Sequence, residues 1–406
     1  MQKRNTFGLI CCLVALCFSG NASAQLAPIK IGIIGPVTGK VSEDMGQSIV
    51  GGARAFAADI NQMGGVLGRQ VELVVRDDQA KSEVGVAIAK ELIAQEKVVA
   101  AVGFGNTGVA LPSAKIFQEA KIPLIVSGAT GVAVTKSFLP PAYPASYIFR
   151  TSASDELQPI VILNDVIDRR KIDKIAVLHD DSPYGQFGNQ NMIAELERRK
   201  IKPVMDEVFK VGEQDMSAML KRVRDSGAQA IVIYCLGPDA ATIAKEAYKL
   251  QLKLPILGPW GMSWQSFIDN AGRGAEGARM SVTFIENDLS SVSNEFSLTY
   301  RKVNKTNHIP SAVAAAQTYD ALRLLALAMI QANSTEGPKV QEALENLQQH
   351  TTTTVVTRYY KPFSPTNHEA ITLNMVVMGE IRNGKVVYAY KEDANSGSIA
   401  RTKQVK

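Results

Sequence analysis

The sequence predicts an α/β protein made of two doubly wound lobes, and three observations support this fold class. Residues 98–130 hold two short apolar runs separated by a helix-length segment with one apolar face, which is the pattern of a βαβ unit. Strand-like and helix-like segments alternate before and after this unit. Extended segments recur near residues 148, 281 and 354. We therefore expect three hinge crossings between the lobes, a cleft and closure by hinge bending.

The N-terminus has the pattern of a cleavable signal peptide over residues 1–24. Lys3 and Arg4 precede an apolar run over residues 7–18, and a small-residue cleavage site, Ala-Ser-Ala, ends the segment. The run is too short to cross a bilayer as a helix. A buried N-terminal helix is the alternative, but the basic start and the small-residue end favour export. We expect the mature chain to begin near Gln25 and to work in the periplasm.

Composition excludes several classes of function. The chain has 406 residues, of which 46% are hydrophobic and 20% charged, which suits two globular domains. The formal charge is +5, and no basic stripe with interleaved aromatic residues accompanies it, so we expect no nucleic-acid partner. Outside the signal peptide Cys235 is the single cysteine, and no H-E-x-x-H motif occurs, so we expect no disulfide, metal or cofactor. No second apolar stretch reaches membrane-spanning length.

The first lobe is expected to alternate strands with helices, because short apolar runs alternate with segments that have one apolar face. A glycine-rich stretch at 61–69 must turn sharply, since glycine takes positive φ freely. The expected strands are 29–34, 71–75, 98–102 and 122–126, and the expected helices are 48–63, 83–95 and 109–120.

The second lobe repeats the alternation, and the C-terminal part adds helices without the strands that a third sheet would need. The expected second-lobe strands are 174–179, 204–208, 230–235 and 254–257, with helices at 156–170, 185–199, 216–225 and 239–250. Beyond them we expect an extended segment at 279–284, helices at 294–302, 311–332 and 339–348 that cover the first lobe, a strand at 351–356, and a hairpin of 372–380 with 385–390 turned at Asn383-Gly384.

These elements define the expected domain organisation. The first lobe comprises 25–148 with 282–353, the second lobe comprises 149–281 with 354–392, and residues 393–406 form a C-terminal tail.

Small and hydroxyl residues follow the two strands of the βαβ unit. Asn106 and Thr107 come after the first strand, and Gly128 and Thr130 come after the second. Ligands of open α/β sheets bind outside the carboxyl ends of the strands. We therefore expect these two loops to form half of a small-molecule site.

Several short motifs stand in a family-specific order. They are IKIGIIGPVTG in residues 29–39, the glycine turn at 58–68, Asp77-Asp78, Ile122-Pro123 with Ser-Gly-Ala-Thr at 127–130, Phe-Arg-Thr at 149–151 with Asp155, His179-Asp180 with Tyr184-Gly185, and Gly258-Pro259. With these motifs the chain resembles the periplasmic leucine/isoleucine/valine-binding protein family, the type I solute receptors of ABC importers. The resemblance covers most of the mature chain.

The resemblance implies a set of binding residues. In the family, backbone N–H and hydroxyl groups bind the α-carboxylate of an amino acid, and the matching positions here are Thr107, Gly128 and Thr130. Asp155 matches a position that contacts the ammonium, while Tyr184 and Met45 match wall positions. Simpler roles stay open: Thr107 or Asp155 as helix caps, and Tyr184 as a surface tyrosine.

Two positions depart from the family pattern. Trp260 stands where amino-acid receptors place an acid after Gly-Pro, and Leu236 stands where a polar or aromatic residue is frequent. Tryptophan can hold a cation only through cation–π attraction, about 0.5–2 kcal/mol. An aromatic or aliphatic carboxylate, or an amide, therefore competes with an amino acid as the expected ligand. Trp260 could also be an ordinary core residue.

The predicted function is that of a non-enzymatic receptor, expected as a monomer, which captures a branched-chain or other amino acid and delivers it to the membrane permease of an ABC importer. A ligand-sensing module is an alternative. A remote alternative is an NAD-dependent oxidoreductase, because residues 103–108 match G-x-G-x-x-G. The acid that should follow the next strand is absent, since that strand ends in Val126-Ser127-Gly128.

Overall fold

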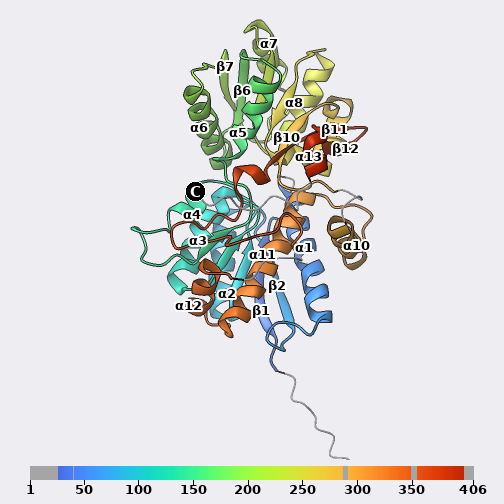
Figure 1. The fold of residues 1–406 in the computed structure, drawn as a ribbon. Helices are drawn as coiled ribbons and strands as arrows, with labels where there is room; N and C mark the ends of the chain where they lie inside the picture. The colour runs from blue at the N-terminus through green and yellow to red at the C-terminus, as the bar shows by residue number, and fades with distance from the viewer. Residues whose placement is uncertain (1–25, 40, 287–290, 349–353, 397–406) are drawn as a thin grey trace, which may run out of the picture.

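A computed structural model describes residues 26–39, 41–286, 291–348 and 354–396, and it contains two separate β-sheets with helices packed around them (Figure 1). The predicted signal peptide and most of the predicted C-terminal tail lie outside the described residues. Figure 1 shows the two sheets one above the other, with the chain running between them. The predicted fold class, two doubly wound α/β lobes, is confirmed.

The first sheet has the order β2-β1-β3-β4-β5, and all of its pairs are parallel. Its inner strands are near-continuous apolar runs because helices cover both faces of a parallel sheet, whereas the edge strand β2 also carries charged residues. The strands are β1 Ile29–Gly35, β2 Val71–Asp77, β3 Ala100–Gly103, β4 Leu124–Val126 and β5 Ile148–Arg150. The helices of this lobe are α1 Glu43–Gln62, α2 Ser82–Ala94, α3 Thr107–Ala120, α4 Ala133–Lys136, α10 Ser291–Asn304, α11 Ala312–Ala332 and α12 Gly337–Glu345.

The second sheet has the order β12-β11-β10-β9-β8-β6-β7 and is parallel except where β11 pairs with its two neighbours. Its strands are β6 Ile175–Asp180, β7 Met205–Phe209, β8 Ala230–Tyr234, β9 Ile256–Gly258, β10 Arg279–Val282, β11 Val377–Arg382 and β12 Lys385–Tyr388. Its helices are α5 Gln158–Leu163, α6 Pro183–Arg198, α7 Ser217–Asp225, α8 Gly237–Lys249, α9 Gln265–Ala271 and α13 Lys391–Ser396. The predicted hairpin is confirmed: Asn383 and Gly384 take positive φ between β11 and β12.

The chain passes between the sheets three times, after β5, after β10 and before β11. The third crossing comes later than the sequence predicts, because residues 355–356 contact α11 and residues 368–370 pair with Arg150 at the end of β5. The backbone N–H groups of Val355 and Val356 donate to the Asp320 carboxylate of α11, at 2.6 and 2.8 Å. The described part of the predicted strand 351–356 is therefore not a strand. Its backbone N–H groups bond to a side chain rather than to another strand, and the pattern of apolar residues does not reveal such a contact.

Helix boundaries show further differences from the predictions. α1 begins at Glu43 rather than near Ser48. The predicted helix 156–170 is an α-helix that continues as a π-helix over Asn164–Arg169, and α9 was not predicted.

α11 corrects the expectation that no apolar stretch beyond the signal peptide reaches membrane-spanning length. It is long and apolar enough to cross a bilayer, but 89% of its most apolar window is buried inside the protein. α11 is the central helix of the first-lobe core, packed against α1 (Figure 1).

Candidate ligand-binding site

One cavity lies between the two lobes, at the carboxyl ends of strands from both sheets. The space between its lining residues amounts to about 310 Å³, part of which is open to solvent. No charged side chain is among its lining residues. They are Met45, Gly105, Asn106, Thr107, Gly128 and Thr130 from the first lobe, and Tyr184, Cys235, Leu236, Trp260, Gly261 and Trp264 from the second.

The start of α3 forms part of the first-lobe wall. Asn106 is the N-cap residue, but its side chain does not cap the helix; its Nδ2 donates instead to Ser42 Oγ at 2.9 Å. The N–H groups of the first turn of α3 therefore lack a side-chain acceptor, and such groups favour a bound anion. The alternative role of Thr107 as N-cap is wrong: Thr107 is the first residue of the helix.

The loop after β4 touches the loop after β3. A Cβ atom on Gly128 would lie 2.8 Å from the Phe104 carbonyl oxygen, so only glycine allows this approach. The Ala129 N–H donates to the same carbonyl at 2.9 Å, and the Gly131 N–H donates to Thr107 Oγ1 at 3.2 Å. The backbone thus brings Thr107, Gly128 and Thr130 to one side of the cavity.

Aromatic side chains dominate the second-lobe wall. Tyr184 lies in the first turn of α6 and packs on Tyr234, with ring centroids 5.2 Å apart. Trp260 follows β9 and meets Trp264 edge to face at 6.1 Å. Burial raises the pKa of Tyr184 well above its usual value, so the phenol stays neutral. Tyr184 and Trp260 both line the cavity and are 9% and 6% exposed, so Tyr184 is not a surface tyrosine.

Leu236 and Met45 complete the apolar lining that the sequence predicts. Leu236 is the N-cap residue of α8, and its N–H donates to the buried Asp180 carboxylate at 3.2 Å. Met45 lies in the first turn of α1, and its methyl group would lie 2.4 Å from a Cβ atom on Gly105. Gly105 thus lies between the side chains of Met45 and Pro36, with no room for a side chain of its own.

Asp155 is the predicted site residue that does not line the cavity. It is fully buried behind the second-lobe wall, where its Oδ1 accepts hydrogen bonds from the Tyr234 hydroxyl at 2.5 Å and from Gln158 Nε2 at 3.2 Å. Its Oδ2 has no hydrogen-bond partner of normal geometry in the described structure, although the Thr130 hydroxyl lies close enough to lower the pKa. Burial outweighs these contacts and raises the pKa of Asp155 to about 6.

Asp155 holds the second-lobe wall in place. Tyr234 packs on Tyr184, and Gln158 accepts a hydrogen bond from the Trp260 N–H at 3.3 Å. The carboxylate therefore supports both aromatic wall residues from behind.

Gly105 lies in one of the two loops that the sequence predicts for the site, but the sequence does not assign site roles to Cys235, Gly261 and Trp264. Trp264 has a signal in hindsight, because it stands four residues after Trp260 in GPWGMSW. Cys235 has none, since it ends an apolar strand like any core residue; burial raises the pKa of its thiol well above the usual value. No group of His, Cys, Asp and Glu side chains within the described ranges could hold a metal ion.

Comparison with known proteins agrees with this architecture. A family model described as periplasmic binding protein matches residues 28–385. The chain belongs to the periplasmic binding protein family. It is of the type I, branched-chain amino acid-binding branch, whose members are non-enzymatic solute-binding proteins of ABC transporters.

Among curated relatives, the leucine-, isoleucine-, valine-, threonine- and alanine-binding protein of Pseudomonas aeruginosa is 28% identical over 84% of this chain and 89% of that protein. The Leu/Ile/Val-binding protein homolog 2 of Brucella abortus is 30% identical over 66% of this chain and 69% of that protein.

Two solved structures with the same fold were determined with different kinds of ligand. A branched-chain amino acid transporter substrate binding protein of Streptococcus pneumoniae, in complex with isoleucine, is 26% identical with a TM-score of 0.75, covering 88% of this chain and 97% of that one. A solute binding protein of Rhodopseudomonas palustris, in complex with benzoate, is 19% identical with a TM-score of 0.74, covering 89% of this chain and 95% of that one.

Proposed function

We propose that this solute-binding protein is the periplasmic receptor of an ABC importer for a small carboxylate with an apolar body and no ammonium group. The observation that carries the proposal is the polarity of the cavity: hydrogen-bond donors on one wall, aromatic rings on the other, and no charged side chain on either.

The carboxylate of the ligand would bind at the first-lobe wall. The uncapped first turn of α3 and the loop at Gly128 and Thr130 supply neutral donors at a positive helix end. Hydrogen bonds to a charged group contribute about 1.5–3 kcal/mol each, so two or three of them account for tight binding of an anion.

An ammonium group would find no comparable partner on the second-lobe wall. By the family resemblance, Trp260 stands where amino-acid receptors place an acid, and Asp155 hydrogen-bonds Tyr234 and Gln158 and is not among the cavity-lining residues. Burying a cation without an opposite charge is costly. The aromatic side chains of Tyr184, Trp260 and Trp264 instead suit an apolar or aromatic ligand body.

A branched-chain amino acid is the second candidate ligand. It is favoured by the 28% identity to the Pseudomonas amino-acid receptor over most of both chains. In that case the ring of Trp260 would hold the ammonium by cation–π attraction, about 0.5–2 kcal/mol, with Asp155 as a distant counter-charge.

Pairs of ligands that differ only in the ammonium group separate the two candidates. We would titrate the purified mature protein calorimetrically with L-leucine and 4-methylpentanoate, and with L-phenylalanine and 3-phenylpropanoate, with benzoate as an aromatic reference. The proposal predicts that each acid without the ammonium binds at least tenfold more tightly than its amino-acid partner. The reverse order would establish the amino-acid reading.

Transport, rather than sensing, is the proposed role of the bound receptor. Presented as a monomer to the cognate permease in membranes, the ligand-bound protein should stimulate ATP hydrolysis more than the ligand-free protein. Equal ATPase rates with and without ligand would favour the sensing alternative.

A further inference from the structure

We propose that Arg150 and Glu369, here called the hinge clamp, position the carboxylate-binding loops of the first lobe and thereby set ligand affinity. This inference rests on the proposed function for its link to ligand. It assigns a role to two residues that do not line the cavity.

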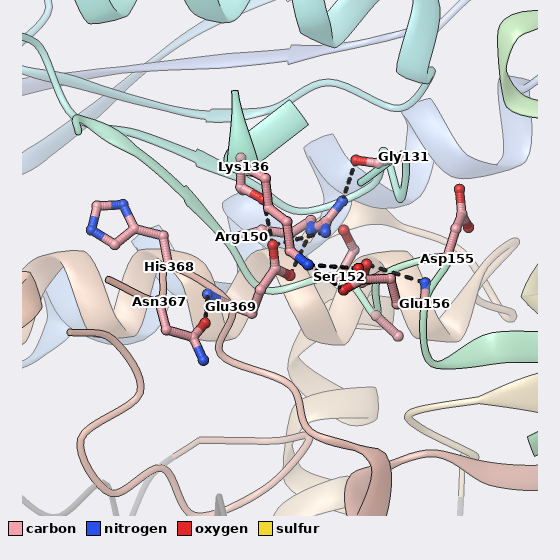
Figure 2. A network of polar contacts seen from close by, with 12 residues as sticks. Gly131, Lys136, Arg150, Ser152, Asp155, Glu156, Asn367, His368 and Glu369 are labelled. Atoms are coloured by element: carbon pink, nitrogen blue, oxygen red, sulfur yellow. Dashed lines mark hydrogen bonds and ion pairs between the residues drawn. The ribbon is translucent and has the colours of Figure 1, made fainter. Parts of the chain in front are cut away.

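The hinge clamp is a bidentate ion pair in which the Arg150 side chain is fully buried and the Glu369 side chain is 15% exposed (Figure 2). Arg150 has no solvent exposure, and its Nε and Nη2 donate to the two carboxylate oxygens of Glu369, each at 2.8 Å. The Thr135 hydroxyl of α4 donates to the same carboxylate. Arg150 therefore has one fixed orientation, because a planar guanidinium that makes two parallel hydrogen bonds cannot rotate.

The third nitrogen of Arg150 reaches the binding loop. Its Nη1 donates to the Gly131 carbonyl at 2.7 Å, as Figure 2 shows, and the Gly131 N–H donates to Thr107 Oγ1 at the start of α3. Gly131 directly follows Thr130, and a Cβ atom on Gly131 would lie 2.4 Å from Thr107 Cγ2. A continuous chain of contacts thus runs from Glu369 through Arg150 and Gly131 to both carboxylate-binding segments.

The clamp also joins two of the three inter-lobe crossings. Arg150 ends β5, just before the first crossing, and Glu369 precedes the third. The backbone fastens the two segments together: the Arg150 N–H donates to the His368 carbonyl and the Ala370 N–H donates to the Arg150 carbonyl, both at 2.9 Å. The His368 ring stacks on Phe149 with centroids 3.9 Å apart. A change at the crossings would therefore be transmitted to the loop at Gly131.

A gain in folding stability does not by itself explain the presence of this ion pair. Burying two charges costs desolvation energy that their attraction repays only in good geometry, and apolar replacements of such pairs are frequently neutral. The ion pair fixes the conformation of the loop because Arg150 donates a hydrogen bond to the Gly131 carbonyl. An apolar pair could not do this, since it has no donor.

Two conservative variants test the clamp. Glu369→Gln removes the negative charge but keeps the size, and Arg150→Lys keeps the positive charge but loses the bidentate geometry. The matched control is Glu380→Gln, which alters a similarly half-buried partner of Arg279, at 2.7 Å, in the second sheet and away from the cavity.

The first readout needs no ligand. Hydrogen exchange of the amides at 128–131 in the ligand-free protein should be at least tenfold faster in both clamp variants than in wild type, and within twofold of wild type in Glu380→Gln. Unchanged exchange in the clamp variants, or equal acceleration in the control, would overturn the inference.

The second readout is affinity for benzoate and 4-methylpentanoate. We expect the dissociation constant to rise at least tenfold in the clamp variants and less than twofold in the control, at comparable losses of melting temperature. Faster loop exchange with unchanged affinity would reject the clamp as a determinant of binding. If neither acid binds wild type, the proposed ligand class fails, and the exchange experiment alone decides whether the clamp positions the loop.

Discussion

Asp155 carries the clearest electrostatic signature near the site. Its carboxyl group is buried, and its pKa is raised to about 6 from 3.8 because burial disfavours the charge. The folded protein therefore holds this proton more tightly than the unfolded chain does. The associated stability is present below about pH 4 and is lost as the pH rises through about 6, which amounts to roughly 3 kcal/mol for a shift of this size.

Asp155→Asn should remove this pH dependence, because the amide keeps an acceptor oxygen for Tyr234 but does not ionise. We expect the variant to be at least as stable as wild type at pH 7.5 and to have no such advantage at pH 4. Urea unfolding of both proteins at the two pH values measures the difference in unfolding free energy between the variant and wild type. Asp78, Asp239 and Asp320, whose pKa values are also raised, contribute equally to both proteins and cancel in this difference. A variant that is several kcal/mol less stable than wild type at pH 7.5 would show that the Asp155 anion is well paired.

At the scale of elements, the binding loops depend on the contact between the turns after β3 and β4. Gly128→Ala would place a Cβ atom 2.8 Å from the Phe104 carbonyl oxygen and must push the loops apart. We expect at least tenfold weaker ligand binding with a stability loss of about 1–3 kcal/mol.

Gly274→Ala is a matched control for Gly128→Ala, since its Cβ would lie 2.4 Å from the Ala244 carbonyl in the second lobe, outside the cavity. Calorimetric titration of both variants with the same acid should show weaker binding only for Gly128→Ala. Equal affinities in the two variants would mean that the loop contact does not shape the site.

Most strands and helices of both lobes could be predicted from the sequence, because short apolar runs alternate regularly with amphipathic segments. The position of the two loops that line the cavity after β3 and β4 was predictable for the same reason, since each follows a recognisable strand. Asp155 was misplaced because burial behind Tyr234 depends on packing between distant segments. The position of the third crossing could not be predicted, because the Asp320 side chain binds the backbone of residues 355 and 356. A contact of this kind leaves no repeating pattern of apolar residues in the sequence.

At the scale of the whole molecule, ligand binding should be coupled to closure of the lobes. A ligand shifts a conformational equilibrium only through contacts that differ between the two states. Ligand would first meet Thr107, Gly128 and Thr130, and Tyr184 and Trp260 would then close over it.

Trp260→Ala should therefore reduce closure more than Thr130→Ala does. We expect small-angle scattering with saturating ligand to show a smaller decrease in radius of gyration for Trp260→Ala, whereas Thr130→Ala should mainly weaken affinity. Equal effects of the two substitutions on closure and affinity would argue against this order of events.

The central claim is that a carboxylate binds at the start of α3 with its apolar body against the tryptophans. The most direct test is a crystal structure of the complex with the tightest-binding acid from the paired titrations. We expect the carboxylate oxygens to lie within hydrogen-bond distance of the backbone N–H groups at Thr107 and Gly128, and the ligand body to lie against Trp260. A carboxylate turned toward Trp260, or a ligand bound outside this cavity, would contradict it.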